Sequence, residues 1–300
     1  MKILVAIDGS EYSQQALASA VKILPKDSLY TLINCVEPVV ADPFGFENYT
    51  QSEIKEINKK LMENSNATLT AGVDFATQSS LNFDTKVILG KSKREIANYA
   101  REHSYDLIVV GSRGMNPFKG LKLGSTTYSL LHHSPCSLLV FKSNPESSSS
   151  PESVKVAFGY CNRQDSLIAC DLLAKLKPEA LDHLFVVTVL QQQHIYGMDP
   201  NTLTSKNKKY IELKKTILER QHDVDELLAP LLEQVPISYA LIEGADNIPF
   251  SLNKFAREQN CDLVVVGNKH ANNHKHVVGN ICLNLVYISK TSVLISQKKA

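Results

Sequence analysis

YAREHSYDLIVVG (99–111) is followed later in the chain by FAREQNCDLVVVG (255–267), and eight of these thirteen positions are identical. The neighbouring segments match as well: KILVAID at 2–8 with VKVAFGY at 154–160, and SLLVF at 137–141 with SVLIS at 292–296. The offsets lie between 152 and 156 residues, so the order and the spacing of the segments are kept together. The sequence therefore predicts an internal duplication.

A polar stretch lies between the two copies. SNPESSSSPE, at 143–152, is rich in serine and proline and cannot form a core. It divides the chain nearly in half, and a chain of 300 residues accommodates about two domains. We therefore expect a domain at 1–144, a linker at 145–152 and a second domain at 153–300.

Short, uniformly apolar segments alternate with amphipathic helical segments in each copy. In the first copy the sequence predicts strands near 2–7, 29–36, 85–89, 106–110 and 137–141, and helices near 13–23, 50–72, 92–103 and 125–132. Strands that are apolar throughout are buried on both faces, and alternation with helices implies right-handed crossovers and a parallel sheet. The predicted fold is α/β: two tandem open doubly wound parallel five-stranded sheets with helices on both faces.

Composition narrows the classes of function. Apolar residues make up 43% of the chain, charged residues make up 21%, and the net charge is +1. This balance gives no general attraction to nucleic acid or to an acidic membrane. No apolar stretch approaches the roughly 18 residues of a membrane span, so we expect no membrane insertion. The six cysteines include no C-x2-C pair, which favours buried thiols and a cytoplasmic protein.

A glycine-rich connection follows the fourth predicted strand. It reads GSRGMNPFKGLKLGST, at 111–126. Its glycines allow the backbone to approach a ligand closely, and the helix that begins near Gly124 offers unpaired N–H groups to an anion. The segment 111–133 contains no acidic residue that could neutralise its basic residues Arg113, Lys119 and Lys122. The connection therefore favours phosphate, although a serine N-cap at Ser125 is the simpler alternative.

The spacing of this connection resembles a family signature. Gly111-x2-Gly114-x9-Gly124-Ser125 matches G-x2-G-x9-G-[ST] of the ATP-binding branch of the universal stress protein family. KILVAIDGSEYSQQAL resembles the family's first strand and helix, LINCVEP its second strand, and DLIVVGSRG its fourth strand and loop. The resemblance covers 1–142 and, more weakly, 153–297. It implies the adenine nucleotide alpha hydrolase-like fold, which agrees with the periodicity, and a role in the stress response.

The resemblance also implies roles for residues of the first copy. Asp8 contacts the nucleoside, and Cys35 meets adenine through its backbone. The phosphates of ATP, accompanied by Mg²⁺, are held by the loop and the helix start: Val110, Gly111, Arg113, Gly114, Gly124, Ser125 and Thr126. The alternatives are an Asp8 that only forms a turn and a Cys35 that is only a buried thiol.

The second copy departs from the signature. Its loop reads GNKHANNHKHVVGN, at 267–280, with His270 in place of the second glycine and Asn280 in place of serine or threonine. An offset of 151 residues also sets Gly159 against Asp8. We therefore expect a degenerate nucleotide motif here. The loop also contains three histidines, His270, His274 and His276. They allow a metal site, but an ordinary solvated loop is the favoured interpretation.

Three functions stay open. The first is a regulatory stress protein that holds ATP in its first copy. The second is a slow ATPase, although a hydrolase needs a positioned base and Asp8 is the only carboxylate that the sequence sets in the crevice. The third is a nucleotide-free scaffold or ligand-binding protein.

The two copies are expected to pair with each other. The apolar terminal strands 137–141 and 292–296 are sheet edges, and an exposed apolar edge is usually covered by pairing. We therefore expect an intramolecular pseudo-dimer through these strands, with a homodimer of the full chain as a further option.

Overall fold

The structure, a computed structural model, describes residues 1–40, 49–114, 123–143, 153–161, 164–191, 211–212, 215–216, 221–245, 247–268 and 279–299. Contacts divide the chain into two compact units. The first unit comprises 1–21, 25–141 and 299–300, and the second comprises 22–24 and 142–298. The predicted linker at 145–152 lies outside the described residues. The predicted domain bounds and the pairing of the two copies stay predictions.

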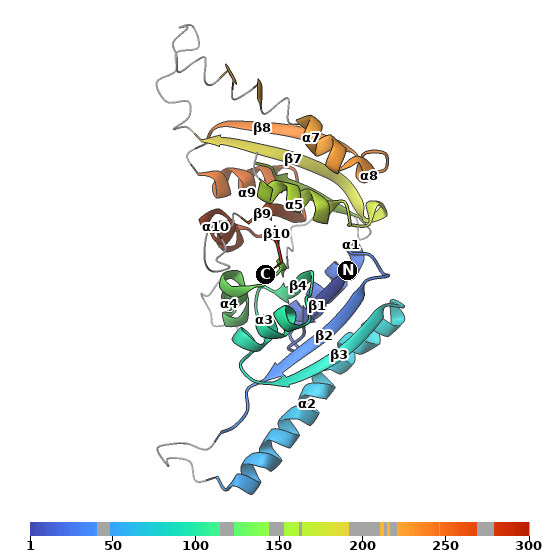
Figure 1. The fold of residues 1–300 in the computed structure, drawn as a ribbon, viewed down its shortest axis with the longest axis vertical. Helices are drawn as coiled ribbons and strands as arrows, with labels where there is room; N and C mark the ends of the chain where they lie inside the picture. The colour runs from blue at the N-terminus through green and yellow to red at the C-terminus, as the bar shows by residue number, and fades with distance from the viewer. Residues whose placement is uncertain are drawn as a thin grey trace. The chain divides into compact units, whose positions relative to one another are not determined.

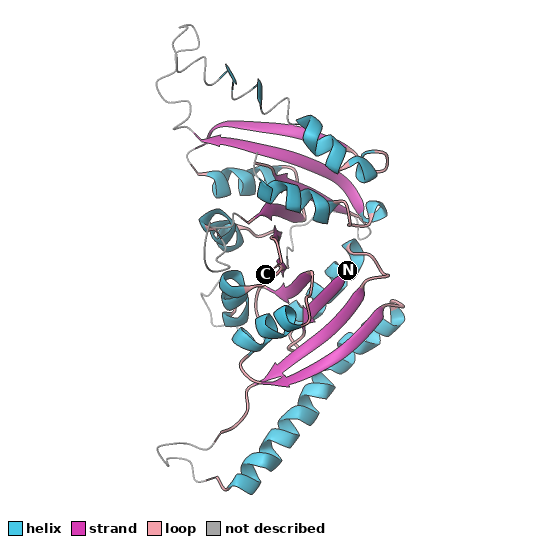
Figure 2. Cartoon of the chain, in the orientation of Figure 1, coloured by secondary structure: helices cyan, strands magenta, loops and turns pink. Residues whose placement is uncertain are grey.

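Strands and helices alternate along the first unit (Figures 1 and 2). Its strands are β1 Lys2–Ala6, β2 Leu29–Val36, β3 Asn82–Leu89, β4 Leu107–Gly111 and β5 Ser137–Phe141. Its helices are α1 Glu11–Ile23, α2 Gln51–Gln78, α3 Ser92–Glu102 and α4 Ser125–His133.

The second unit repeats this order. Its strands are β6 Val154–Gly159, β7 Leu181–Gln191, β8 Ile237–Ala245, β9 Leu263–Gly267 and β10 Ser292–Ser296. Its described helices are α5 Gln164–Leu173, the 3₁₀ turn η1 Pro178–Ala180, α7 Gln221–Leu227, α8 Ala229–Leu232, α9 Ile248–Glu258 and α10 Asn280–Ile288.

Each unit holds a parallel sheet with one reversal of strand order. In the first unit the order is β3-β2-β1-β4-β5, and each neighbouring pair of strands is parallel. In the second unit the order is β8-β7-β6-β9-β10, again parallel. The chain therefore builds outward from β1 in one direction and then from β4 in the other, which confirms the doubly wound α/β fold. Ligands of such sheets bind beyond the carboxyl ends of the strands at this switch point.

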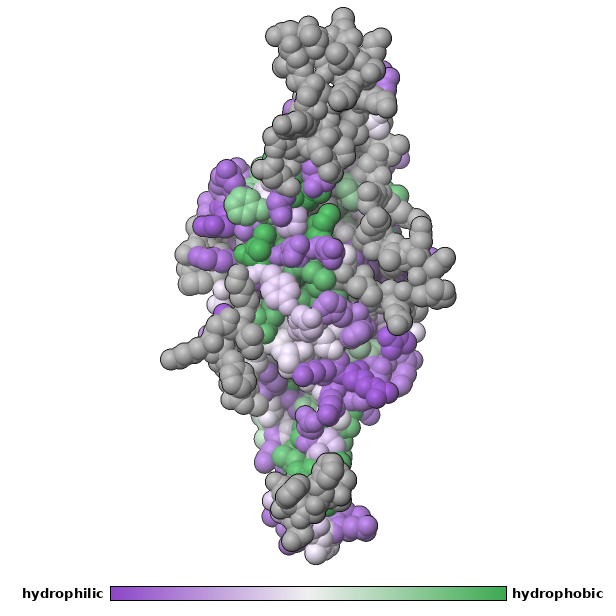
Figure 3. All heavy atoms as spheres, turned by 90° about the vertical axis from the view of Figure 1, so that its left-hand side faces the viewer, coloured by the Kyte–Doolittle hydropathy of each residue, from purple (hydrophilic) through white to green (hydrophobic). Residues whose placement is uncertain are grey.

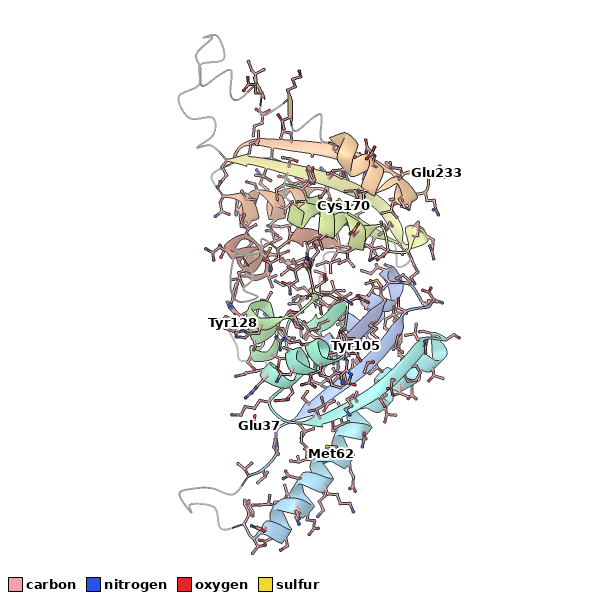
Figure 4. The ribbon with its side chains drawn as sticks, viewed as in Figure 1. Glu37, Met62, Tyr105, Tyr128, Cys170 and Glu233 are labelled. Carbon is pink, nitrogen blue, oxygen red and sulfur yellow. The ribbon has the colours of Figure 1, made fainter. Side chains whose placement is uncertain are left out.

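Alternate residues of β2 meet helices on opposite faces of the first sheet. Leu32 lies under α2, because a Cβ added to Gly72 would be 3.3 Å from its Cδ1. The preceding residue, Thr31, accepts a 2.7 Å hydrogen bond from the hydroxyl of Tyr105, which lies on the other side between α3 and β4 (Figure 4). Since side chains along a strand alternate between faces, helices cover β2 on both sides. This double cover explains why its central residues, from Tyr30 to Asn34, are all buried.

Helix α2 is longer than the sequence predicts. The predicted helix ends at Gly72, whereas α2 continues to Gln78. Gly72 is buried inside the helix, where the missing side chain lets α2 approach β2 closely. Thr50 begins the helix with a capping box, since its hydroxyl accepts from the backbone N–H of Glu53 while the Glu53 carboxylate accepts from the backbone N–H of Thr50. Met62 lies in the amino-terminal half of α2, which extends past the strands of the first sheet (Figures 1 and 4).

The corresponding helical segment of the second copy is interrupted. The sequence favours a long helix near 203–232, of which 203–210, 213–214 and 217–220 lie outside the described residues. In the described part, α7 ends at Leu227 and α8 begins at Ala229. Pro230 falls in the first turn of α8, a position that proline tolerates because its missing N–H is not needed there.

The structure corrects one alignment between the copies. In the first copy the backbone N–H of Asp8 donates to Ser13 Oγ at 3.4 Å. In the second copy the backbone N–H of Cys161 makes the same bond to Ser166 Oγ at 3.0 Å. Cys161, and not Gly159, is therefore the counterpart of Asp8. The predicted alignment was wrong by two residues, because side chains repeat every second residue along a strand and a shift of two keeps the faces unchanged.

No helix within the described ranges is both long and apolar enough to cross a membrane. On the face that Figure 3 shows, hydrophilic and hydrophobic residues of the described chain are interspersed.

Candidate functional site

A cavity of about 260 Å³ lies at the switch point of the first sheet. The nine residues that the sequence singles out all line it: Asp8, Cys35, Val110, Gly111, Arg113, Gly114, Gly124, Ser125 and Thr126. They come from the carboxyl ends of β1, β2 and β4 and from the start of α4. The sequence therefore predicted which residues would meet in space, while their binding roles stay proposals. Lys119 and Lys122 lie outside the described residues.

Asp8 forms a tight turn at the end of the first strand. Its Oδ1 accepts hydrogen bonds from the backbone N–H of Ser10 at 3.0 Å and from the Ser10 hydroxyl at 2.6 Å. The intervening Gly9 has a φ of 83°, which glycine adopts without strain. The turn thus fixes the carboxylate while its other oxygen, Oδ2, faces Gly114. The turn that the alternative expects is present, and it leaves the second carboxylate oxygen of Asp8 facing the cavity.

A side chain is excluded at two glycines of the loop, for a different physical reason at each. A Cβ on Gly111 would lie 2.9 Å from the backbone of Tyr12, so this glycine lets the end of β4 pack against the start of α1. A Cβ on Gly114 would lie 2.6 Å from Asp8 Oδ2, so this glycine keeps space beside the carboxylate. Gly111 is therefore required by packing, whereas Gly114 is required by the cavity.

The start of α4 faces the cavity without a side-chain cap. Gly124 is the N-cap residue and makes no side-chain hydrogen bond, and Ser125 is the first helical residue. The alternative in which Ser125 caps the helix is therefore wrong. The backbone N–H of Gly124 donates to the carbonyl of Ser112 at 2.8 Å, which fixes the loop against the helix. The first-turn N–H groups of α4 favour an anion on this side of the cavity, and Arg113, which also lines it, adds a positive charge.

The thiol of Cys35 is unsuited to nucleophilic or ligand chemistry. Burial, with a smaller contribution from the nearby carboxylate of Glu95, raises the pKa of Cys35 to about 12. The thiol therefore stays protonated at neutral pH, and a protonated thiol neither attacks nor binds a metal well. Any contribution of Cys35 to a ligand must come from its backbone or from packing.

Sequence reasoning missed several residues of the cavity. The polar ones are Ser13, Asn34, Ser92 and Thr127, and Ile33 and Ile96 are among the apolar ones. Asn34 could have been found, because it is a polar residue inside an otherwise apolar strand. Its amide N–H donates to the carbonyl of Ile7, and its Oδ1 accepts from the hydroxyl of Ser65 in α2. Asn34 therefore holds the end of β1, and with it the Asp8 turn, in place.

Replacing Asn34 should show the cost of breaking this buried network. We expect Asn34→Leu to lower the free energy of unfolding by about 1–3 kcal/mol, because it leaves the buried hydroxyl of Ser65 without its acceptor. The double variant Asn34→Leu/Ser65→Ala should recover part of this loss, because both polar partners are then gone. Urea unfolding of both variants measures the effect, and a double variant less stable than Asn34→Leu would contradict it.

The second copy does not repeat the chemistry of this cavity. Cys161 holds the position of Asp8, and Asn280 and Ile281 begin α10 where Ser125 and Thr126 begin α4. The loop histidines from 270 to 276 lie outside the described residues. Elsewhere in the described chain, no group of three or more His, Cys, Asp or Glu side chains could hold a metal ion.

These features define a tandem α/β protein with a polar cavity at the switch point of its first sheet. A family model described as the universal stress protein family matches residues 1–142 and 155–297. The chain therefore belongs to the universal stress protein family, and it carries two domains of that family.

The chain is also similar to individual proteins of known sequence or structure. The universal stress protein YxiE of Bacillus subtilis (strain 168) is 30% identical over 152 residues, which is 47% of this chain and 98% of the relative. The crystal structure of a universal stress protein from Archaeoglobus fulgidus DSM 4304 covers 99% of this chain and 96% of its own, with a TM-score of 0.62 and 15% identity. A third structure, of a universal stress protein in complex with cAMP, covers 48% of this chain and 98% of its own, with a TM-score of 0.37 and 21% identity.

Proposed function

We propose that the first domain binds ATP, accompanied by Mg²⁺, and that the chain acts as a nucleotide-dependent regulatory protein of the cytoplasmic stress response. The observation that carries the proposal is the convergence of all nine predicted residues on one cavity at the switch point. The alternatives that the sequence leaves open are a nucleotide-free scaffold and a slow ATPase.

The residues of the cavity fit a nucleotide. Apolar side chains of Ile33, Ile96 and Val110 offer a surface for a base, and Asp8 Oδ2 offers an acceptor for sugar hydroxyls. The first turn of α4 and Arg113 offer donors and positive charge for phosphates. A Cβ on Gly114 would lie 2.6 Å from Asp8 Oδ2, so this glycine keeps space beside that acceptor. The Mg²⁺ would be held largely by phosphate oxygens and water, which suits this ion.

Binding should be visible as a change in thermal stability. With ATP and Mg²⁺ a hundredfold above the dissociation constant, a ligand of the native state adds about 2.7 kcal/mol. A domain of about 145 residues gains roughly 2–4 °C for each kcal/mol, so the transition of the first domain should rise by several degrees. Differential scanning calorimetry with ATP, cAMP and adenosine, each with Mg²⁺, measures the shift and ranks the ligands.

Two results would each support one of the alternative functions instead. No shift with any nucleotide at millimolar concentration, together with purified protein free of nucleotide by mass spectrometry, would favour the nucleotide-free scaffold. Phosphate release over many turnovers, lost in Asp8→Ala, would favour the ATPase. Among the described lining residues Asp8 is the carboxylate of the cavity, and its Oδ1 already accepts two hydrogen bonds from Ser10.

A further inference from the structure

Two hydroxyls from different helices meet at the cavity. Ser92 is the first residue of α3, and Thr126 is the second residue of α4. Ser92 Oγ and Thr126 Oγ1 are 2.8 Å apart, and both residues line the cavity. The two helices pack side by side (Figure 1), so this hydrogen bond joins their amino-terminal ends. The sequence motif contains Thr126 but not Ser92.

This pair can offer a hydrogen bond to a ligand. A hydroxyl has one donor and two acceptor positions, and the mutual bond uses the donor of one member. The other member therefore keeps a proton that it can give to an oxygen in the cavity. Lys91, the N-cap residue of α3, makes no side-chain cap, so the start of α3 adds a second uncapped helix end beside that of α4. Both helix dipoles favour an anionic oxygen at this place.

The second domain supplies an internal comparison. Helices α3 and α9 each have 11 residues, and helices α4 and α10 each have 9, so their positions correspond directly. The first residue of α9 is Ile248, and the second residue of α10 is Ile281. Both hydroxyls are therefore replaced by isoleucine in the copy that lacks Asp8 and the glycine–serine signature.

The amino-terminal end of α9 is capped by the side chain of its N-cap residue. Asn247, the N-cap residue of α9, accepts a 3.0 Å hydrogen bond from the backbone N–H of Phe250. Lys91 makes no such bond at the start of α3. The hydroxyl pair and the uncapped helix start thus occur together in the first domain, and both are missing at the matching positions of the second.

We infer that Ser92 is a further ligand-binding residue of the first domain, which contributes a hydroxyl from α3 to the phosphate-binding side of the cavity through its pair with Thr126. The inference rests on the proposed nucleotide function and adds to it an element outside the sequence signature. The group that it recognises is a phosphate oxygen rather than a sugar hydroxyl, because two helix amino-terminal ends converge there.

The test compares Ser92→Ala with Ser129→Ala in the full-length protein. Ser129 is a matched control, because its hydroxyl also joins α4 to α3, through a 2.7 Å bond to the carbonyl of Lys93, but it does not line the cavity. Competition against a fluorescent ATP analogue gives the affinities for ATP–Mg²⁺ and adenosine. We expect Ser92→Ala to weaken ATP binding about tenfold, as for the loss of a hydrogen bond to a charged group. Adenosine binding should stay unchanged, and Ser129→Ala should change neither affinity.

A conservative variant and a stability measurement complete the test. Ser92→Thr keeps the hydroxyl and should bind ATP within about threefold of the wild type. The melting temperatures without ligand show whether Ser92→Ala is destabilised more than Ser129→Ala, which would assign it a structural role. Equal losses for ATP and adenosine, or no loss for either, would overturn the inference. A wild-type protein that binds no nucleotide would instead overturn the proposed function itself.

Discussion

Gly114→Val should reduce the affinity for ATP–Mg²⁺ at least a hundredfold, which corresponds to about 2.7 kcal/mol. A Cβ at this position would lie 2.6 Å from Asp8 Oδ2, closer than any real Cβ contact, so the carboxylate must move. Valine adds two further methyl groups beside the loop, where phosphate is proposed to lie. The variant therefore removes space for the ligand and displaces Asp8 at once. Isothermal titration calorimetry of the wild type and the variant measures the loss.

The stability of the ligand-free protein separates this effect from misfolding. Gly114 is half-exposed, and the displaced carboxylate makes two hydrogen bonds worth about 1 kcal/mol each, so the melting temperature should fall by no more than several degrees. Gly279→Ala is the control from the second domain, since its Cβ would meet Asn268 Oδ1 at an ordinary 3.7 Å. It should leave ATP binding unchanged. Full binding by Gly114→Val would show that the ligand does not approach this loop.

The fold was predictable because its signal is repeated. Uniformly apolar strands, amphipathic helices and two copies in the same order define a doubly wound sheet without any knowledge of contacts. The end of α2 was not predictable in this way. Gly72 indicates a helix end by its propensity, and only the close approach of α2 to Leu32 explains why the helix continues through it.

The alignment of Asp8 with Gly159 failed for a related reason. Gly159 is needed where it stands, because a Cβ there would lie 2.7 Å from Leu252 Cδ2. That contact comes from a helix about 90 residues later in the chain, so nothing near β6 indicates it. The hydrogen bonds of the following turn, and not the strand itself, identify Cys161 as the matching residue.

The residues of the candidate site also differ in whether the local sequence or a distant contact identifies them. Residues within the glycine–serine signature were predictable, because closely spaced backbone N–H groups need small residues at fixed intervals. Asn34 and Ser92 were not included, because each acts through a partner from another element, Ser65 of α2 and Thr126 of α4. A polar residue at the carboxyl end of a predicted parallel strand, or at the start of the next helix, is the local signal that could find such residues.

The role of Asp8 can be resolved by exchanging one atom. Asp8→Asn keeps an oxygen that accepts both hydrogen bonds from Ser10, so the turn and the melting temperature should be preserved. The atom facing Gly114 becomes an N–H donor in place of the acceptor Oδ2. If Oδ2 accepts from a sugar hydroxyl, its loss removes a hydrogen bond to a charged group, and adenosine affinity should fall roughly tenfold to a hundredfold.

The ratio of the losses for adenosine and ATP decides between two roles of this carboxylate. Removing a negative charge near the phosphates also relieves repulsion, so ATP affinity should fall less than adenosine affinity. A carboxylate that instead helps to hold Mg²⁺ would give the opposite ratio, with adenosine unaffected and ATP–Mg²⁺ weakened. The expected ratio is also the reverse of that for Ser92→Ala, which should weaken ATP and spare adenosine. Measured together by competition binding, the two variants separate the nucleoside side of the cavity from its phosphate side, and a parallel response of both would show that these sides are not distinct.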